Sequence, residues 1–216
     1  MNNYRLNIGC GDTPSNGWTN IDNSISIKLA NYPFLTKFLA LFRLLNTNQL
    51  KYIDFCKQNN VIWADVVNRI PFKENSVEAI YTAHMLEHLD RENSTKFLLN
   101  AKKVLKPGGV LRISVPDLKM LIDGYLKHGS ADKFLEDSLL TIIAPKTFFK
   151  KITLLITGFR HHQWMYDADS LINLLKNCGF VNVQEKSSSS SDIQNTEGLN
   201  LDERSEESVY IECSVD

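Results

Sequence analysis

The chain has 216 residues, of which 43% are hydrophobic and 23% are charged, as in an ordinary globular protein with a substantial core. Its formal net charge of −1 gives no bulk electrostatic reason to expect a nucleic-acid partner. The four cysteines are widely spaced and form no Cys-x-x-Cys pair, which argues against a zinc knuckle or a redox motif. We therefore expect one domain over residues 1–216, with free thiols.

The N-terminal sequence, Met-Asn-Asn-Tyr, has neither the basic region nor the apolar region of an export signal. Apolar stretches near residues 33–45 and 139–158 are interrupted by lysine and arginine, so neither supplies the roughly 18 continuous apolar residues of a membrane span. These features predict a cytoplasmic protein.

Apolar stretches alternate with helical patterns along the chain, which favours a parallel sheet flanked by helices. The expected strands cover residues 4–8, 19–21, 61–64, 77–82, 110–115, 181–185 and 209–213. An apolar stripe predicts a helix over residues 96–105, and Asp117 is expected to cap the next helix. Asp169 or Ser170 is expected to cap a later helix that ends at Gly179. Polar residues 187–207 predict a mobile loop before the last strand.

Two helical insertions, near residues 28–60 and 130–166, interrupt this alternation. Both leave the sheet at the carboxyl ends of strands, where ligands bind in open α/β sheets. The first carries an apolar stripe at helical spacing, made by Leu35, Phe38, Leu39, Phe42 and Leu45. Packing against the body explains such stripes most simply. A lid over a binding pocket, or peripheral contact with lipid or a membrane, is the alternative.

Glycines interrupt the chain directly after the first predicted strand. Gly9, Cys10 and Gly11 form this break, and glycines here let a ligand lie close to the backbone, although a tight turn uses glycine for the same reason. A dinucleotide-binding fold requires Gly-x-Gly-x-x-Gly with an acid about 20 residues further on. Pro14 occupies the third glycine position and Asp22 comes too early, so the spacing argues against a hydride-transfer enzyme.

The motif order resembles that of class I S-adenosylmethionine-dependent methyltransferases, in particular small bacterial ones. The segments that carry the resemblance are Leu-Asn-Ile-Gly-Cys-Gly, Asn-Ile-Asp, Ala-Asp-Val, Ile-Tyr-Thr-Ala-His-Met-Leu-Glu-His-Leu and Val-Leu-Lys-Pro-Gly-Gly. The resemblance spans nearly the whole chain and implies S-adenosyl-L-methionine as the cofactor. It also implies an α/β, Rossmann-like, mostly parallel sheet of seven strands in the order 3-2-1-4-5-7-6, with the last strand antiparallel and helices on both faces.

The resemblance further implies a set of cofactor-binding residues. They are Asn7, Gly9, Cys10, Gly11, Asp22, Asp65, Val66, Thr82 and Ala83. Asp22 would accept the ribose hydroxyls, and Asp65 would accept from the adenine amino group with Val66 beside the ring. Asn7 departs from the pattern, since many relatives carry an acid there. The short segment between the first two strands leaves room for a very short helix or a turn, and Pro14 and Gly17 fit a turn.

A second motif places two histidines around a glutamate after the fourth strand. His84, Glu87 and His88 match His-x-x-Glu-His, in which histidines on one helix face hold zinc and the glutamate acts as a base. A zinc-dependent hydrolase is therefore an alternative. The resemblance instead predicts no metal, with His84 a candidate catalytic residue and His88 in the acceptor pocket. A helix-start histidine bonded to the backbone is the simplest interpretation.

A third cluster precedes the penultimate helix. We predict His162 first and His161 second as the base that deprotonates an acceptor hydroxyl, because imidazole titrates near neutral pH. Trp164 and Tyr166 would line the acceptor pocket. Alternatively, this cluster is structural, with Trp164 in the core and Asp167 as a helix cap.

These observations predict methyl transfer to a small-molecule or glycan acceptor. The small bacterial relatives suggest a sugar hydroxyl in a surface-polysaccharide or secondary-metabolite pathway. The Asn-Pro-Pro-Tyr signature of amide and exocyclic-amine methylation does not follow the fourth strand, which argues against adenine or glutamine as the acceptor. A cofactor-binding module without catalysis is a further alternative.

Overall fold

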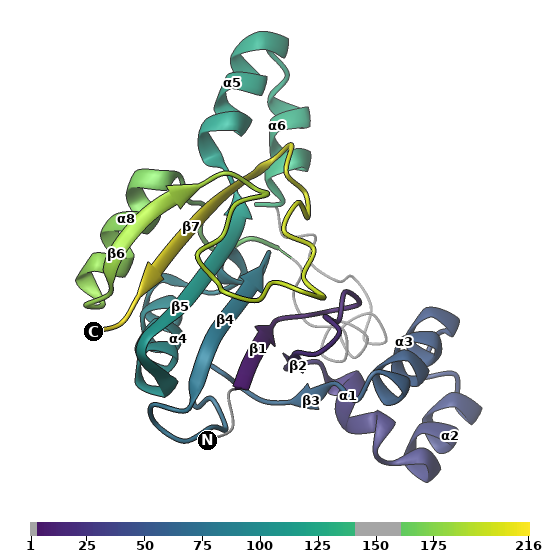
Figure 1. Cartoon of the computed structure of the whole chain (residues 1–216). Helices are drawn as coiled ribbons and strands as arrows, with labels where there is room; N and C mark the ends of the chain where they lie inside the picture. Colours follow the sequence, from purple (N-terminus) through teal and green to yellow (C-terminus); the bar gives the residue numbers. More distant parts are fainter. Residues whose placement is uncertain (1–3, 141–160) are drawn as a thin grey trace.

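The computed structural model describes residues 4–140 and 161–216. Seven strands form one sheet in the order β3-β2-β1-β4-β5-β7-β6 (Figure 1). The strands are β1 (Tyr4–Ile8), β2 (Thr19–Asp22), β3 (Ile62–Trp63), β4 (Val77–Ala83), β5 (Leu105–Pro116), β6 (Val181–Lys186) and β7 (Ser208–Ser214). Pairing is parallel from β3 to β5, whereas β7 runs antiparallel to both β5 and β6. The predicted strand order and the antiparallel last strand are confirmed.

The described helices flank this sheet. They are α1 (Ile25–Ala30), α2 (Pro33–Leu41), α3 (Thr47–Gln58), the short 3-10 helix η1 (Leu86–His88), α4 (Arg91–Val104), α5 (Leu118–His128), α6 (Ala131–Ser138) and α8 (Ala168–Asn177). The buried stripes of α4 and α8 join the main core cluster with β1, β4, β5 and β7. Within the described residues, no helix is long and apolar enough to cross a membrane.

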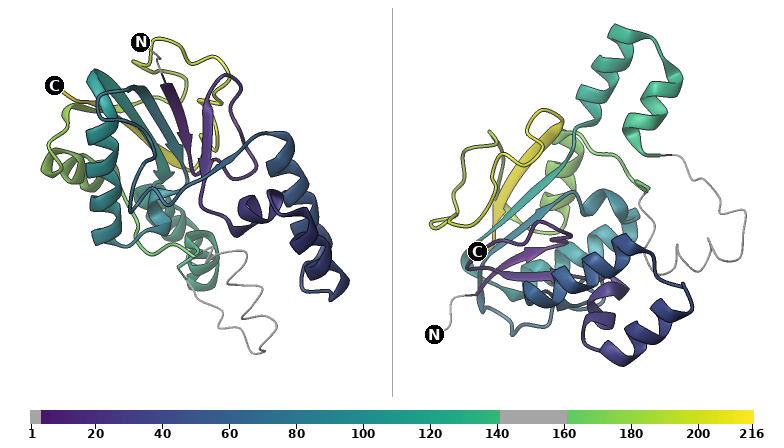
Figure 2. Two further views of the ribbon diagram at one scale, coloured as in Figure 1. Left: turned by 90° about the horizontal axis from the view of Figure 1, so that it is seen from below. Right: turned by 90° about the vertical axis from the view of Figure 1, so that its right-hand side faces the viewer.

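A loop covers part of the opposite face of the sheet. Trp18, Ala79, Tyr81 and Ile193 form a separate buried cluster there, and residues 187–207 pass over it (Figure 2). The connection between β1 and β2 is a turn, as its length predicts, so it supplies no helix to this face. Helices α1–α3 instead gather beyond the β3 edge of the sheet (Figure 1).

Helix starts follow capping side chains. Asp117 caps α5 by accepting from the amide of Lys119, as predicted. At α8 the N-cap is Asp167, as the structural interpretation of its cluster expected, rather than Asp169 or Ser170, and Ser170 completes a reciprocal capping box with it. An extended residue outside the helix can turn its carboxylate back to the first-turn amides, which explains why the cap precedes the predicted position.

The apolar stripe of the first insertion divides between core and surface. Leu45 is buried in a satellite cluster around α1 and α3, and Leu39 packs against it. Leu35, Phe38 and Phe42 are 47%, 56% and 60% exposed, and α2 buries no residue. Packing therefore explains only part of the stripe, while the alternatives of a lid and of lipid contact stay predictions. Much of the second insertion lies outside the described residues.

Candidate functional site

The carboxyl ends of β1, β2 and β4 meet at one edge of the sheet. Asn7 of β1 is in register with Asn20 of β2 and Tyr81 of β4, and these strands are parallel. The chain leaves β1 through Gly9, whose amide donates to the carbonyl of Ile21 at 2.8 Å. The predicted glycine turn therefore lies beside the end of β2, where ligands bind in this type of sheet.

The two glycines have different surroundings. Gly9 has a φ of +73°, and a Cβ on it would lie 2.6 Å from Cγ of Met85. Gly11 has a φ of +48°, and a Cβ there would meet nothing within 4 Å. Gly9 is thus required by the backbone and by its close contact with Met85, whereas a side chain on Gly11 would point into space that no described atom fills.

Asp22 closes this turn. Its Oδ2 accepts from the Gly11 amide at 3.2 Å, and its Oδ1 accepts from the Ser24 amide at 2.8 Å. Each carboxylate oxygen still has acceptor capacity for a ribose hydroxyl. The hydroxyl of Tyr52 in α3 donates to the Gly11 carbonyl at 3.1 Å, a contact that the sequence analysis missed because no local signal links α3 to this turn.

Asn7 and Cys10 are buried beside the turn and hold it in place. The buried Asn7 amide donates to the carbonyl of Thr13 at 3.2 Å, Oγ of Ser15 at 3.0 Å and Oδ1 of Asn20 at 3.1 Å. These bonds replace the acid expected at this position and hold the turn between β1 and β2. Burial raises the pKa of the Cys10 thiol, so this cysteine stays protonated and packs as an apolar residue.

The remaining predicted cofactor residues lie along the ends of β3 and β4. Asp65 is half-buried, and its Oδ2 accepts from Nδ2 of Asn68 at 2.6 Å. Val66 is buried in the main core cluster. Thr82 is buried, and its hydroxyl has no hydrogen-bond partner within residues 4–140 and 161–216, while Ala83 is half-buried at the last position of β4.

Three histidines surround the buried carboxylate of Glu87. Nδ1 of His84 lies 3.4 Å, and Nε2 of His162 lies 3.8 Å, from the same Glu87 oxygen. The ring of His88 is edge-on to that of His162, with centroids 5.1 Å apart. His84 has a φ of +50°, an unfavourable conformation for a non-glycine residue and one that concentrates at functional sites.

Backbone hydrogen bonds bring His162 to this cluster from a distant part of the sequence. The amides of Gln163 and Trp164 donate to the Glu87 carbonyl at 2.8 Å and 3.2 Å. Nε2 of Gln163 donates to the His88 carbonyl at 2.6 Å. The segment is thus fastened to η1 by its main chain, which leaves the imidazole of His162 facing the glutamate.

The electrostatics of the cluster favour a neutral His162. Burial lowers the pKa of His162, and this effect outweighs the Glu87 carboxylate, which acts in the opposite direction. His84 is held by Ser208, whose Oγ lies 2.9 Å from its Nε2. If the Nε2–H donates to that hydroxyl, the lone pair of Nδ1 stays available as a proton acceptor.

The other predicted residues of this segment have separate roles. His161 contributes its carbonyl, which lies 3.1 Å from Nδ1 of His88. Trp164 is 43% exposed, and the guanidinium of Arg91 lies 5.5 Å from its ring centroid. Tyr166 is fully buried in the core and its hydroxyl donates to Oγ of Ser94 at 3.1 Å, while its place in an acceptor pocket stays a prediction.

The arrangement differs from the helical zinc motif considered above. Glu87 and His88 belong to a single turn of 3-10 helix, and His84 precedes it with a positive φ. His84 and His88 therefore do not share one face of an α-helix. The structure instead adds His162 to the cluster from outside the motif.

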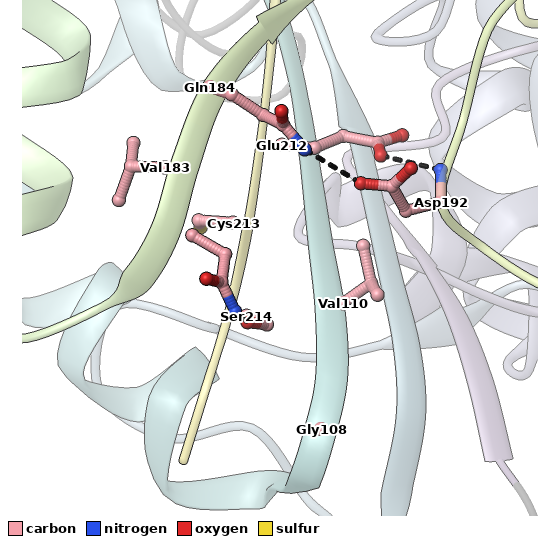
Figure 3. A pocket seen from close by; sticks show the side chains of 9 residues that line it. Gly108, Val110, Val183, Gln184, Asp192, Glu212, Cys213 and Ser214 are labelled. Carbon is pink, nitrogen blue, oxygen red and sulfur yellow. Dashed lines mark hydrogen bonds between the residues drawn. The ribbon is translucent and has the colours of Figure 1, made fainter.

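A hollow of about 500 Å³ lies elsewhere, over β5, β6 and β7 (Figure 3). Gln184, Asp192 and Glu212 line it and are joined by hydrogen bonds. Oε2 of Glu212 accepts from the Asp192 amide at 2.7 Å, and Oδ2 of Asp192 accepts from Nε2 of Gln184 at 2.8 Å. Its lining includes Gly108 at the amino end of β5, whereas ligands in this type of sheet bind at carboxyl ends. We therefore do not assign the functional site to it.

Residues 6–185 match the model of a protein family described as a methyltransferase domain. A solved S-adenosylmethionine-dependent methyltransferase from Thermotoga maritima, described as a possible histamine N-methyltransferase, is 14% identical, with a TM-score of 0.54 over 100% of this chain and 84% of that chain. Another, from Methanosarcina mazei, is 14% identical, with a TM-score of 0.53 over 99% of this chain and 92% of that chain. No curated protein matches the sequence. At this identity the two structures support the fold alone.

Proposed function

We propose that this chain, which belongs to the methyltransferase-domain family, transfers a methyl group from S-adenosylmethionine to a hydroxyl of a small-molecule or glycan acceptor. The family match confirms the resemblance to S-adenosylmethionine-dependent methyltransferases, and with it the cofactor. It does not favour the zinc-dependent hydrolase. The cofactor residues, the acceptor and the base are the parts that we propose here.

The surroundings of Gly11 support a cofactor position at the ends of β1 and β2. The open space beside Gly11 admits a ligand against the backbone, and the Asp22 carboxylate lies at its edge with acceptor capacity for ribose hydroxyls. Asp65 and Val66 follow β3, the neighbour of β2, and would contact the adenine. We therefore assign ribose recognition to Asp22 and adenine recognition to Asp65.

One observation carries the proposed acceptor chemistry: a buried carboxylate with an imidazole on two sides, at the end of β4 next to the glycine turn. Met85, which contacts Gly9, lies between His84 and Glu87 in the sequence and links the two regions. The sulfonium of the bound cofactor supplies an electrophilic methyl group. A hydroxyl acceptor must give its proton to a base as it is methylated. An amine or thiol acceptor depends less on such a base.

We assign proton removal to one of the two imidazoles beside Glu87, His84 or His162. Each has a buried ring nitrogen without a hydrogen-bond partner in the described chain. As the acceptor oxygen takes the methyl group, its proton moves to the imidazole, and the Glu87 carboxylate stabilises the imidazolium that forms. His161 remains our second choice, because the contact that links it to the cluster is made by its main-chain carbonyl.

A sugar is the acceptor that we favour. The cluster offers several hydrogen-bonding groups and the partly exposed Trp164 lies on the same segment, a combination that suits a hydroxylated ring. The small bacterial methyltransferases that the chain resembles suggest a surface-polysaccharide or secondary-metabolite pathway, and we propose that the reaction takes place in the cytoplasm.

Calorimetry with S-adenosylmethionine and S-adenosylhomocysteine tests the cofactor site. We expect Asp22→Ala to weaken binding by about 1–3 kcal/mol, since it removes a charged hydrogen-bond acceptor. Asp123→Ala, on the exposed face of α5, is the matched control and should bind as the wild type does. Absence of binding to the wild-type chain would refute the proposal.

Product formation tests the acceptor. A panel of sugars, phenols and amines is incubated with cofactor, and S-adenosylhomocysteine release is measured. Turnover on a hydroxyl compound that falls in His84→Gln or His162→Gln, with cofactor affinity retained, supports the proposal. Turnover on amines alone would refute the hydroxyl acceptor, and tight cofactor binding without turnover would favour a binding module.

A further inference from the structure

Among the described residues, the Glu87 carboxylate has neither a lysine or arginine partner nor a hydrogen-bond donor that accounts for its burial. It is 1% exposed, and neither of its oxygens has a hydrogen-bond partner in the described part of the chain. A buried ionised carboxylate is costly unless a cation or donors compensate it. Two imidazole nitrogens face one of its oxygens, Nδ1 of His84 at 3.4 Å and Nε2 of His162 at 3.8 Å.

The side chains around this carboxylate have the arrangement of metal ligands. One oxygen of Glu87 and one ring nitrogen each of His88 and His162 all lie within 4.8 Å of one another. Ligand atoms in a tetrahedral zinc site lie roughly 3.3–3.6 Å apart, as follows from bonds of about 2.0–2.2 Å. Small rotations of these side chains would therefore bring all three to one ion.

The orientation of His88 supports the same interpretation. Its Nδ1 lies 3.1 Å from the His161 carbonyl, which can accept only from an N–H. This bond places the proton on Nδ1 and leaves the lone pair on Nε2. A ligand histidine is commonly held in this way, with one ring nitrogen bonded to a backbone carbonyl and the other directed at the metal.

We propose that Glu87, His88 and His162 bind a divalent transition-metal cation, with Zn²⁺ and Mn²⁺ as the ions that fit this ligand set. Two histidines and one carboxylate leave at least one coordination position for another oxygen. Mg²⁺ fits less well, because it prefers oxygen ligands in an octahedron. This ligand set differs from the sequence-based expectation of no metal, and it exchanges His84 of the hydrolase motif for His162.

The cation would have a definite role if the hydroxyl acceptor proposed above is correct. An acceptor oxygen bound to the cation would be more acidic, as metal-bound water is. With His162 serving as a ligand, the proton passes to His84. The oxygen then forms its bond to the methyl carbon, and the electron pair of the broken carbon–sulfur bond stays on sulfur.

Metal uptake tests the site without reference to activity. The full chain is stripped with a chelator, dialysed, and titrated with Zn²⁺, Mn²⁺ and Mg²⁺ by calorimetry, and its metal content is measured by mass spectrometry. We expect one Zn²⁺ or Mn²⁺ per chain. Glu87→Gln and His162→Gln should each weaken binding at least about tenfold, whereas His128→Gln, on the exposed end of α5, should leave it unchanged.

Two further measurements keep the test decisive. His88 is only half-buried, so His88→Gln tests the site if a variant at a fully buried ligand does not fold. Co²⁺ loading gives a visible spectrum that should change in His88→Gln. Lack of uptake by the wild type, or uptake that the three ligand variants leave unaltered, would overturn the proposal.

Parallel calorimetry with S-adenosylmethionine separates this proposal from the proposed function. Metal uptake without cofactor binding would retain the metal site and refute the reaction. Cofactor binding with turnover that a chelator does not reduce, in a chain that takes up no cation, would retain the reaction and refute the metal site.

Discussion

The buried ion pair between Arg112 and Glu212 provides a quantitative test of how the sheet holds the loop of residues 187–207, which begins with five serines. Nη1 of Arg112 lies 2.9 Å from Oε1 of Glu212, and the two side chains are 0% and 1% exposed. The same guanidinium donates to the carbonyls of Ser188 and Ser190 at 2.5 Å and 2.6 Å. Glu212 also accepts from the Asp192 amide. The pair therefore fastens residues 187–192 to β5 and β7.

Arg112→Met should lower the free energy of unfolding by about 3–5 kcal/mol, because it leaves the Glu212 charge buried without its partner. Hydrogen bonds to charged groups contribute about 1.5–3 kcal/mol each. Arg112 makes one to Glu212 and several to loop carbonyls, so the predicted loss lies at the low end of what these bonds could contribute. Arg112→Met combined with Glu212→Met removes both charges. The double variant should be more stable than the sum of the single losses predicts.

Urea unfolding followed by circular dichroism measures all three variants. Lys186→Met is the matched control, since Lys186 pairs at 2.8 Å with Asp192, which is 52% exposed on the same loop. The Lys186 side chain is only 15% exposed, but its partner carboxylate faces solvent, and such a pair contributes about 0–1 kcal/mol, so this variant should change stability little. A loss below about 1 kcal/mol for Arg112→Met, or strictly additive losses in the double variant, would refute the reasoning.

Further predictions concern the glycine turn, the last helix and the histidine cluster. Gly9→Ala should cost more stability than Gly11→Ala in urea unfolding: both pay about 1–2 kcal/mol for a positive φ, but only the first forces a Cβ to within 2.6 Å of Met85. Gly11→Ala should instead lose cofactor affinity in calorimetry. Asp167→Ala removes the N-cap of α8 and should cost about 1 kcal/mol in the same unfolding assay. Burial lowers the pKa of His162, so below about pH 6.5 the unfolded state binds a proton that the folded state does not. Stability should thus fall as the pH drops below that value, and His162→Gln should reduce this slope in thermal unfolding.

The sheet could be predicted because its signals are local. Each predicted strand is an apolar stretch bounded by turn residues, and all seven occur in the structure with small shifts of their ends. The largest shift is at β5, which begins at Leu105 rather than Val110. Lys106, Pro107 and the glycines that follow predict a turn, but β4 and β7 on either side extend the pairing into that segment.

The candidate site could be predicted only in part, for a related reason. Gly9, Gly11 and Asp22 follow strands directly, so the parallel sheet brings them together once the strands are known. The contact between Glu87 and His162 depends on backbone hydrogen bonds between η1 and residues 163–164. No pattern in the sequence specifies that pairing, since neither segment is a strand and residues 163–164 lie at the far end of the second insertion.

The cofactor side of the site belongs to the shared fold, whereas the acceptor side is individual to this chain. The strand ends that would hold the cofactor belong to the fold that the chain shares with other methyltransferases. The acceptor side is built from η1 and from residues 162–164 at the end of the second insertion, so insertions can change the acceptor while the sheet stays constant. The choice of acceptor therefore depends on the groups around Glu87. Because a bound cation would favour an acceptor that binds through oxygen, the metal content of the purified chain is the measurement that most directly limits the class of acceptor.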